Sequence, residues 1–126
     1  MVIKMGGNQT KILVIDDEPD VGDFLKHFLS GREYEVLTAY GFDEALAILE
    51  KTKFAFVILD LVMNGSSGSA LAEIIDQKYP ETKIIVITAY VREAIELERR
   101  VKVDACFIKP LGLEELYLKL SELQNV

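Results

Sequence analysis

The sequence has one cysteine, no long apolar run and few basic side chains, and each shortage excludes a class of protein. The single cysteine, Cys106, excludes an internal disulfide and a zinc site built from cysteines. No apolar run approaches the roughly 18 residues of a membrane-spanning helix. The opening stretch, MVIKMGGNQT, lacks the apolar core of roughly 7–15 residues found in signal peptides. We therefore expect a cytoplasmic protein that does not associate with membranes.

The charge and the length indicate one acidic domain. There are 14 Lys and Arg against 21 Asp and Glu, and this net charge of −7 argues against direct nucleic-acid binding, which requires a basic face. With 126 residues, of which 50% are hydrophobic and 28% charged, the chain suits a single globular domain with its own core. We expect residues 1–10 to form a flexible head and residues 11–126 to form this domain.

Short apolar runs alternate along the chain with stretches of helical spacing. The runs read KILVID (11–16), YEVLTA (34–39), FAFVILD (54–60), KIIVITA (83–89) and ACFIK (105–109). Several of them are continuously apolar and rich in Val and Ile, as expected of parallel strands that are covered on both faces. The sequence therefore predicts five buried strands.

Five helices are expected between and after these strands. The first has an apolar stripe of Val21, Phe24, Leu25, Phe28 and Leu29, and the others are expected at about 43–51, from 68 to before Pro80, at about 91–102, and at 113–123. Alternating strands and helices imply right-handed crossovers, and hence a parallel sheet with helices on both faces. The predicted fold class is α/β.

Polar residues stand where four of the strands end. Asp16 and Asp17 follow the first strand, Asp60 the third, Thr88 the fourth and Lys109 the fifth. Ligands of an open parallel sheet bind at the carboxyl ends of its strands, so we expect these side chains to converge. Clustered carboxylates suit Mg²⁺, and a carboxylate can also attack phosphorus to form an acyl phosphate. A metal ion and a lysine would then neutralise the phosphoryl oxygens.

These motifs, taken together and in order, resemble those of a known family. IDDEP after the first strand, ILDLVM at Asp60, ITA at Thr88 and KP at Lys109 resemble the receiver domain of two-component response regulators, over about residues 11–126. The resemblance implies a flavodoxin-like three-layer sandwich. This is a doubly wound, five-stranded parallel sheet of order 2-1-3-4-5 with five helices.

The resemblance also implies a role for each residue that matches the family's motifs. Asp60 would be the phosphoacceptor and a metal ligand, Asp17 the main acidic ligand of Mg²⁺, and Asp16 a ligand that acts largely through water. The backbone carbonyl of Val62, two residues after the phosphoacceptor, would complete the metal site. The expected cofactor is therefore Mg²⁺.

Partners follow from the same resemblance. Thr88 and Lys109 would contact a phosphoryl group donated by a sensor histidine kinase or a phosphotransfer protein. Phosphorylation would then change a face formed by the fourth helix, the fifth strand and the fifth helix. A downstream protein, a fused output domain or a second copy would bind there. Such a domain is a signalling switch rather than an enzyme, because its product is a state of the protein.

One departure from the family pattern leaves a second interpretation open. Receivers usually carry Tyr or Phe three residues before the lysine, but this chain has Cys106, and Phe107 is expected on the opposite face of the strand. The alternative is therefore a pseudo-receiver, an interaction module without an aromatic switch. The resemblance also places Val62 and Tyr90 at positions that in receivers influence how water reaches the acyl phosphate, and we expect these bulky side chains to slow dephosphorylation.

Three further interpretations depend on the acidic stretch alone. Asp16 and Asp17 are alternatively explained as caps of the first helix, since Asp is a favoured N-cap residue. An aspartyl phosphatase would require D-x-D at the first strand end, whereas the chain reads DDE. A nucleotide-binding domain of this fold class would favour Ser, Thr and Gly there, because three acids repel an unneutralised phosphate.

Overall fold

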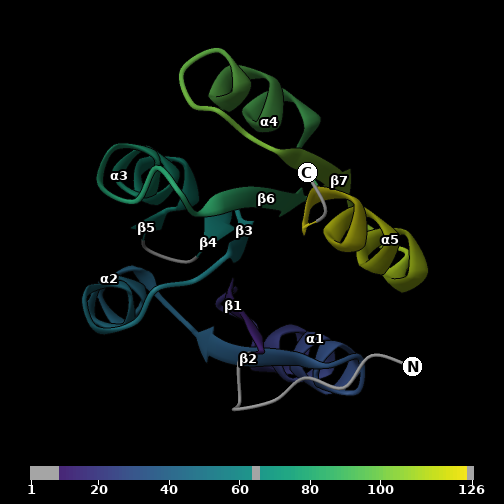
Figure 1. The fold of residues 1–126 in the computed structure, drawn as a ribbon. Coiled ribbons are helices and arrows are strands. Elements are labelled where there is room, and N and C mark those ends of the chain that lie inside the picture. Colours follow the sequence, from purple (N-terminus) through teal and green to yellow (C-terminus); the bar gives the residue numbers. More distant parts are fainter. Residues whose placement is uncertain (1–8, 64–65, 125–126) are drawn as a thin grey trace.

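A five-stranded parallel sheet forms the centre of the molecule, seen in a computed structural model that describes residues 9–63 and 66–124 (Figure 1). The strand order is β2-β1-β3-β6-β7. These strands are β1 at Thr10–Ile15, β2 at Tyr34–Ala39, β3 at Phe56–Asp60, β6 at Lys83–Thr88 and β7 at Ala105–Ile108. The labels β4 and β5 belong to a separate hairpin, so this order is the one expected as 2-1-3-4-5, and the prediction is confirmed.

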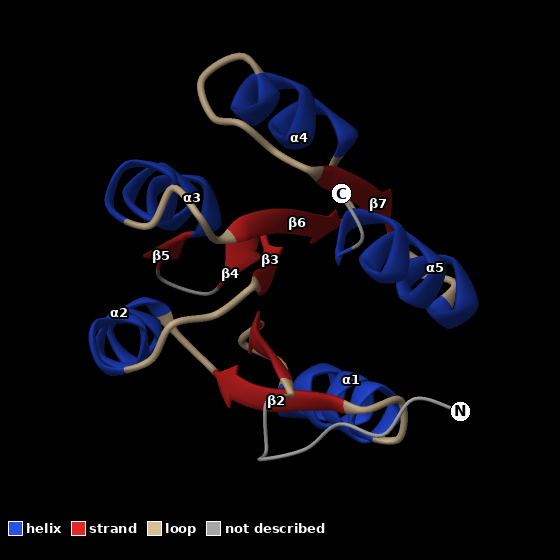
Figure 2. Ribbon diagram, viewed as in Figure 1, coloured by secondary structure: helices blue, strands red, loops and turns tan. Residues whose placement is uncertain are grey.

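The helices α1 to α5 cover the two faces of the sheet (Figure 2). They are α1 at Pro19–Ser30, α2 at Phe42–Lys51, α3 at Gly68–Lys78, α4 at Val91–Glu98 and α5 at Leu113–Gln124. The buried side chains of α1 and α5 pack in one half of the core, and those of α2, α3 and α4 pack in the other half. The molecule is therefore the doubly wound, three-layer α/β sandwich expected from the alternation of strands and helices.

The strands are apolar on both faces because each face has its own layer of helices. In β1, Leu13 and Ile15 belong to the core half under α2, α3 and α4, while Ile12 and Val14 belong to the half under α1 and α5. All five residues of β3 are buried, including Asp60 at its carboxyl end. The continuous apolar runs of the sequence are thus explained by burial on both sides.

A short hairpin between β3 and α3 was not expected from the sequence. Its strands are β4 at Val62–Met63 and β5 at Ser66–Ser67, with Val62 paired to Ser67 and Met63 to Ser66. Ser67 is also the N-cap of α3, and its Oγ accepts a hydrogen bond from the Ala70 N–H at 3.2 Å. Two-residue strands leave no periodicity that a sequence pattern could detect.

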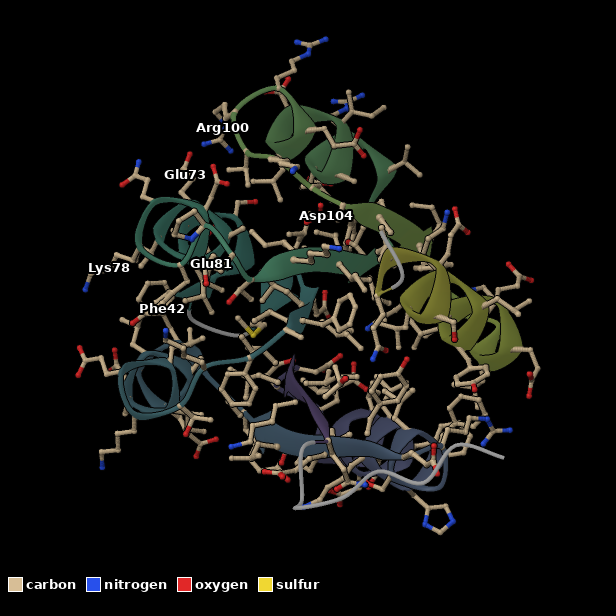
Figure 3. The ribbon with its side chains drawn as sticks, viewed as in Figure 1. Phe42, Glu73, Lys78, Glu81, Arg100 and Asp104 are labelled. Atoms are coloured by element: carbon tan, nitrogen blue, oxygen red, sulfur yellow. The ribbon has the colours of Figure 1, made fainter. Side chains whose placement is uncertain are left out.

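The fourth helix is shorter than expected, ending at Glu98 instead of near residue 102. The N–H of Arg100 donates to the Leu97 carbonyl at 2.9 Å, an i to i−3 bond that tightens the last turn. The chain then turns so that Val101 is buried in the core. An ion pair joins Arg100 in this turn to Glu73 of α3 (Figure 3). Burial of Val101 thus overrides the helix propensity of the charged residues around it.

The apolar stripe of α1 is also narrower than its sequence pattern. Leu25 and Leu29 are buried as expected, but Phe24 is 59% exposed. The buried face of α1 passes through Gly22, where a β-carbon would lie 3.5 Å from Thr38 and 3.6 Å from Tyr40. These are ordinary van der Waals distances. The face of α1 that meets the sheet carries Gly22, Leu25 and Leu29, and Phe24 lies outside it.

Two further expectations from the sequence concern the N-terminal residues and the absence of a membrane-spanning helix. The flexible head expected at residues 1–10 falls almost wholly on residues 1–8, which lie outside the described part of the chain, and Thr10 already begins β1. Within the described ranges, none of the helices has the length and apolar character needed to span a bilayer.

Candidate functional site

Three carboxylates meet where β1 and β3 end. Asp16 and Asp17 follow β1, and Asp60 is the last residue of the adjacent β3. One oxygen from each of the three lies within 4.8 Å of the other two. Asp16 is only 4% exposed and Asp60 only 7%. The sequence predicted this convergence, and the described geometry places the three side chains together.

The turn after β1 holds Asp16 in the site and not at the end of a helix. The N–H of Glu18 donates to Asp16 Oδ1 at 2.9 Å, and the N–H of Asp16 donates to the Ala39 carbonyl at 3.1 Å. The N-cap of α1 is Glu18, which makes no side-chain capping bond, and Pro19 follows at the first helical position. The alternative in which Asp16 or Asp17 is the N-cap of this helix is therefore wrong.

Lys109 brings a positive charge to this acidic cluster. Its Nζ donates to Asp60 Oδ2 at 3.0 Å and lies 3.6 Å from Asp16 Oδ2. Burial lowers the pKa of Lys109, but the hydrogen bond to Asp60 and the charge of Asp16 outweigh it, so the pKa is raised. Burial also raises the pKa of Asp16, against the opposing effects of the Glu18 N–H and of Lys109. Three carboxylates and one lysine thus share this site, and Lys109 contacts two of the three acids.

The carboxylate of Asp60 is fixed from two sides. The backbone N–H of Val62 donates to Oδ1 at 3.0 Å, and Lys109 donates to Oδ2. The side chain of Val62 is 44% exposed, so it lies at the rim of the site. Two donors on a buried carboxylate hold its orientation, which is the property that a positioned nucleophile or metal ligand requires.

Thr88 links the site to the beginning of α4. It ends β6, one residue beyond Ile87, which pairs with Asp60 across the sheet, and it is fully buried. Its Oγ1 accepts a hydrogen bond from the N–H of Tyr90 at 3.0 Å. A hydroxyl that accepts one bond still has its own proton to donate. Tyr90 is the N-cap of α4 and is 52% exposed, so it lies at the surface.

Cys106 occupies a half-buried position on β7. It packs against the core half under α4, while Phe107 packs in the other half, under α1 and α5. The expectation that Phe107 points to the opposite face is confirmed. Burial, with the charge of Glu98 as a smaller cause, raises the pKa of the Cys106 thiol. The thiol is therefore a small core side chain at the edge of the sheet.

Sequence reasoning missed a hollow beside Lys109. It has a volume of about 630 Å³ and is walled mainly by apolar side chains, with Glu18 and Asp20 at its border. The apolar walls are Val21, Phe24 and Leu25 from α1 together with Pro110, Leu111 and Leu113 from the chain after β7. Phe24 lines this hollow from an exposed position that the helical pattern did not indicate.

Comparison with known proteins identifies the family. The family model of the response regulator receiver domain matches residues 12–121. The chain belongs to this family. Its receiver fold is shared by a CheY-like receiver domain from Methanospirillum hungatei, with a TM-score of 0.88 and 27% identity, over 94% of this chain and 95% of that one. The response regulator TrrA of Thermotoga maritima, solved in complex with Mg(2+)-BeF, has 36% identity and a TM-score of 0.82, over 90% and 98%.

Curated relatives of this receiver domain are longer proteins. The transcriptional regulatory protein ResD of Bacillus subtilis is 32% identical over 92% of this chain and 48% of ResD. A putative transcriptional regulator of Haloferax volcanii is 31% identical over 89% of this chain and 19% of that protein. The chain thus spans about half of the first relative's length and about a fifth of the second's.

Proposed function

We propose that this receiver domain accepts a phosphoryl group on Asp60, in a Mg²⁺-dependent reaction, from a histidine kinase or a phosphotransfer protein. The observation that carries the proposal is the grouping of three carboxylates within 4.8 Å, one of which is fixed by Lys109 at 3.0 Å. The product is a phosphorylated state and not a released metabolite. The domain is therefore proposed as a signalling switch and not as an enzyme.

The donor set suits Mg²⁺. Carboxylate and carbonyl oxygens are the hard ligands that this ion takes, and it usually keeps several waters. Asp17, Asp60 and the backbone carbonyl of Val62 would hold the ion, with Asp16 acting largely through water. When bound, Mg²⁺ offsets the charge of the acids and of the transferring phosphoryl group. The Mg(2+)-BeF complex of TrrA supports this assignment.

Three residues of this chain have separate roles in the proposed phosphoryl transfer. One carboxylate oxygen of Asp60 forms the bond to phosphorus while the bond from phosphorus to the donor's histidine nitrogen breaks, and the electron pair of that bond leaves with the nitrogen. Lys109, which already donates a hydrogen bond to the Asp60 carboxylate, would then donate one to a phosphoryl oxygen. Thr88 would donate its hydroxyl proton to a second phosphoryl oxygen.

The readout would begin at Thr88. Its Oγ1 accepts a hydrogen bond from the N–H of Tyr90, which is the N-cap of α4. If the Thr88 hydroxyl rotates toward a phosphoryl group, the beginning of that helix would therefore change. The face built from α4, β7 and α5 carries exposed apolar side chains, with Ile95 51%, Ile108 43% and Leu118 63% exposed. A downstream protein, a fused output domain or a second copy is proposed to bind there.

The apolar hollow beside Lys109 is proposed as the place where the donor protein docks. It opens next to the proposed phosphoacceptor site, and its border carries Glu18 and Asp20. An apolar surface with basic residues at its edge would complement this hollow.

The single free thiol, Cys106, agrees with the reducing cytoplasm in which we place the chain.

The test of the proposal is adduct formation. The protein is incubated with Mg²⁺ and acetyl phosphate, or with beryllium fluoride, and mass spectrometry and ¹⁹F NMR detect a covalent or bound adduct. We expect an adduct in the wild type and none in Asp60→Asn, in which the carboxylate is lost. If the wild type forms no adduct, and cognate kinases also fail, the phosphoacceptor assignment is wrong.

A second candidate is an interaction module without a switch, favoured by Cys106 at the position where receivers carry an aromatic ring. This half-buried thiol offers no ring to move into the space beside Thr88. Amide chemical shifts of α4 and the oligomeric state, measured with and without beryllium fluoride, distinguish the two candidates. Adduct formation that leaves both unchanged favours the interaction module.

A further inference from the structure

We infer that Gly68 is a positioning residue of the phosphoacceptor site, because its missing side chain lets α3 lie directly on the backbone that joins Asp60 to Val62. The inference depends on the proposed function, since it concerns the geometry of the proposed metal and phosphoryl site. Gly68 is the first residue of α3 and is buried. It reacts with nothing itself, and it acts through the backbone that it touches.

The approach is too close for any side chain. A β-carbon on Gly68 would lie 2.3 Å from the carbonyl oxygen of Asp60, 2.6 Å from the Cα of Leu61 and 2.8 Å from the Leu61 carbonyl oxygen. All three atoms are backbone, so none of them can rotate away as the end of a side chain could. The N–H of Gly68 also donates to the Leu61 carbonyl at 3.0 Å. A substitution must therefore displace either α3 or the segment after Asp60.

Strand pairing anchors one side of this contact, and packing in the core anchors the other. The β3 strand pairs with β1 on one side and β6 on the other, and Asp60 itself is paired with Ile87. On the other side, α3 is held by Leu71 and Ile75, which are both fully buried. Leu61 between them is also buried, at 4% exposed, but it has no partner in the ladder of the main sheet. The junction after Asp60 is thus expected to move first.

The hairpin transmits such a movement to the proposed metal site. Val62 of β4 pairs with Ser67 of β5, which directly precedes Gly68. The N–H of Val62 donates to Asp60 Oδ1, and its carbonyl is the proposed backbone ligand of Mg²⁺. A displacement at Gly68 therefore shifts a ligand and the donor that orients the phosphoacceptor together.

The deciding experiment compares Gly68→Ala with a matched glycine variant. Gly41→Ala is the control, because a β-carbon there meets nothing within 4 Å. NMR titration with Mg²⁺ alone, and ¹⁹F NMR with beryllium fluoride, measure the site, while circular dichroism measures the fold. We expect Gly68→Ala to weaken Mg²⁺ binding by about ten- to a hundredfold, as the loss of a supporting contact around a metal typically does. Gly41→Ala should bind as the wild type does.

Stability must be separated from positioning. Ile75→Val loosens α3 in the core without filling the contact at Gly68, so it should lower the melting temperature and leave the Mg²⁺ titration unchanged. If Gly68→Ala is unfolded in buffer, the same titrations are made in an osmolyte that restores the fold. A folded Gly68→Ala that binds Mg²⁺ as tightly as the wild type would show that α3 moves instead, and would overturn the inference. Failure of the wild type to bind would contradict the proposed function itself.

Discussion

The third and the fifth strands of the sheet, β3 and β7, carry the two parts of the proposed switch and are built differently. β3 has five residues, all buried, with a paired strand on each side. β7 has four residues, pairs only with β6, and exposes 43% of Ile108. The proposed chemistry thus lies on a central strand that is paired on both sides, where geometry is preorganised. The proposed readout lies at an edge strand that is paired on one side, where small free energies shift populations.

The largest effect on stability is expected from truncating Leu97, which packs α4 against the core. Leu97 is fully buried, and truncating a buried Leu typically lowers the free energy of unfolding by about 2–5 kcal/mol. We expect Leu97→Ala to lose this amount in urea denaturation while the Mg²⁺ affinity of the folded protein stays unchanged. Ile95→Ala, at a 51% exposed position on the same helix, is the control and should change stability by no more than about 0.5 kcal/mol. A parallel loss of Mg²⁺ affinity in Leu97→Ala would show that the two regions are not separable.

In the acidic site, the burial of the Asp16 carboxylate is expected to lower the stability of the folded chain. Burial raises the pKa of Asp16 in the folded chain above the ordinary value that it has in the unfolded chain. Between these two pKa values the folded state keeps a proton that the unfolded state has lost, so stability falls as pH rises through this interval. Asn cannot ionise. We therefore expect Asp16→Asn to be more stable than the wild type at neutral pH without Mg²⁺, and to show a smaller fall in stability with pH.

Urea denaturation from about pH 4 to about pH 7 measures this difference. Asn can still accept the Glu18 N–H that Asp16 accepts at 2.9 Å, and Lys109 keeps its bond to Asp60, so the comparison isolates the charge. Added Mg²⁺ should stabilise the wild type more than Asp16→Asn, because ligand binding to the folded state adds to its stability. A variant that is less stable than the wild type at neutral pH would contradict this account.

The residues of the candidate site could be predicted, because a polar residue directly after an apolar run marks the end of a strand in the sequence. Asp60, Thr88 and Lys109 each stand directly after an apolar run, and the geometry of a parallel sheet brings such positions to one edge. Five strands and five helices followed from the apolar runs and the helical spacing between them, whereas the strand order followed from the resemblance to the receiver family. The family motifs assigned a role to each residue, whereas spacing alone indicated only an acidic site with a hydroxyl and a lysine.

What the sequence did not predict depends on tertiary contacts. The close approach at Gly68 and the β4–β5 hairpin involve too few residues to leave a periodic pattern. The end of α4 at Glu98 depends on the burial of Val101, and the exposure of Phe24 depends on which face of α1 meets the sheet. Each of these features is set by packing between elements, which overrides local propensity.

A moderate effect is expected at the rim of the site, where Val62 is 44% and Tyr90 52% exposed. Replacement by polar residues should let water reach the acyl phosphate more readily, so we expect Val62→Asn and Tyr90→Glu to shorten its lifetime severalfold. The lifetime is measured as the decay of the phosphorylated protein after the donor is removed. Leu118→Asn, on the exposed surface of α5, is the control and should decay as the wild type does. Unchanged lifetimes in both rim variants would exclude this role.

The smallest effect is expected for the ion pair between Arg100 and Glu73, which joins the turn after α4 to α3 (Figure 3). The two side chains are 49% and 39% exposed, and exposed pairs contribute only about 0.2–1 kcal/mol and are screened by salt. We expect Glu73→Gln to lower the free energy of unfolding by no more than about 1 kcal/mol at low salt, and by less at high salt. A double-mutant cycle with Arg100→Gln isolates the pair. A loss as large as that of Leu97→Ala would mean that charge, and not the buried leucine, holds α4 against the sheet. The readout would then respond to salt as well as to phosphorylation.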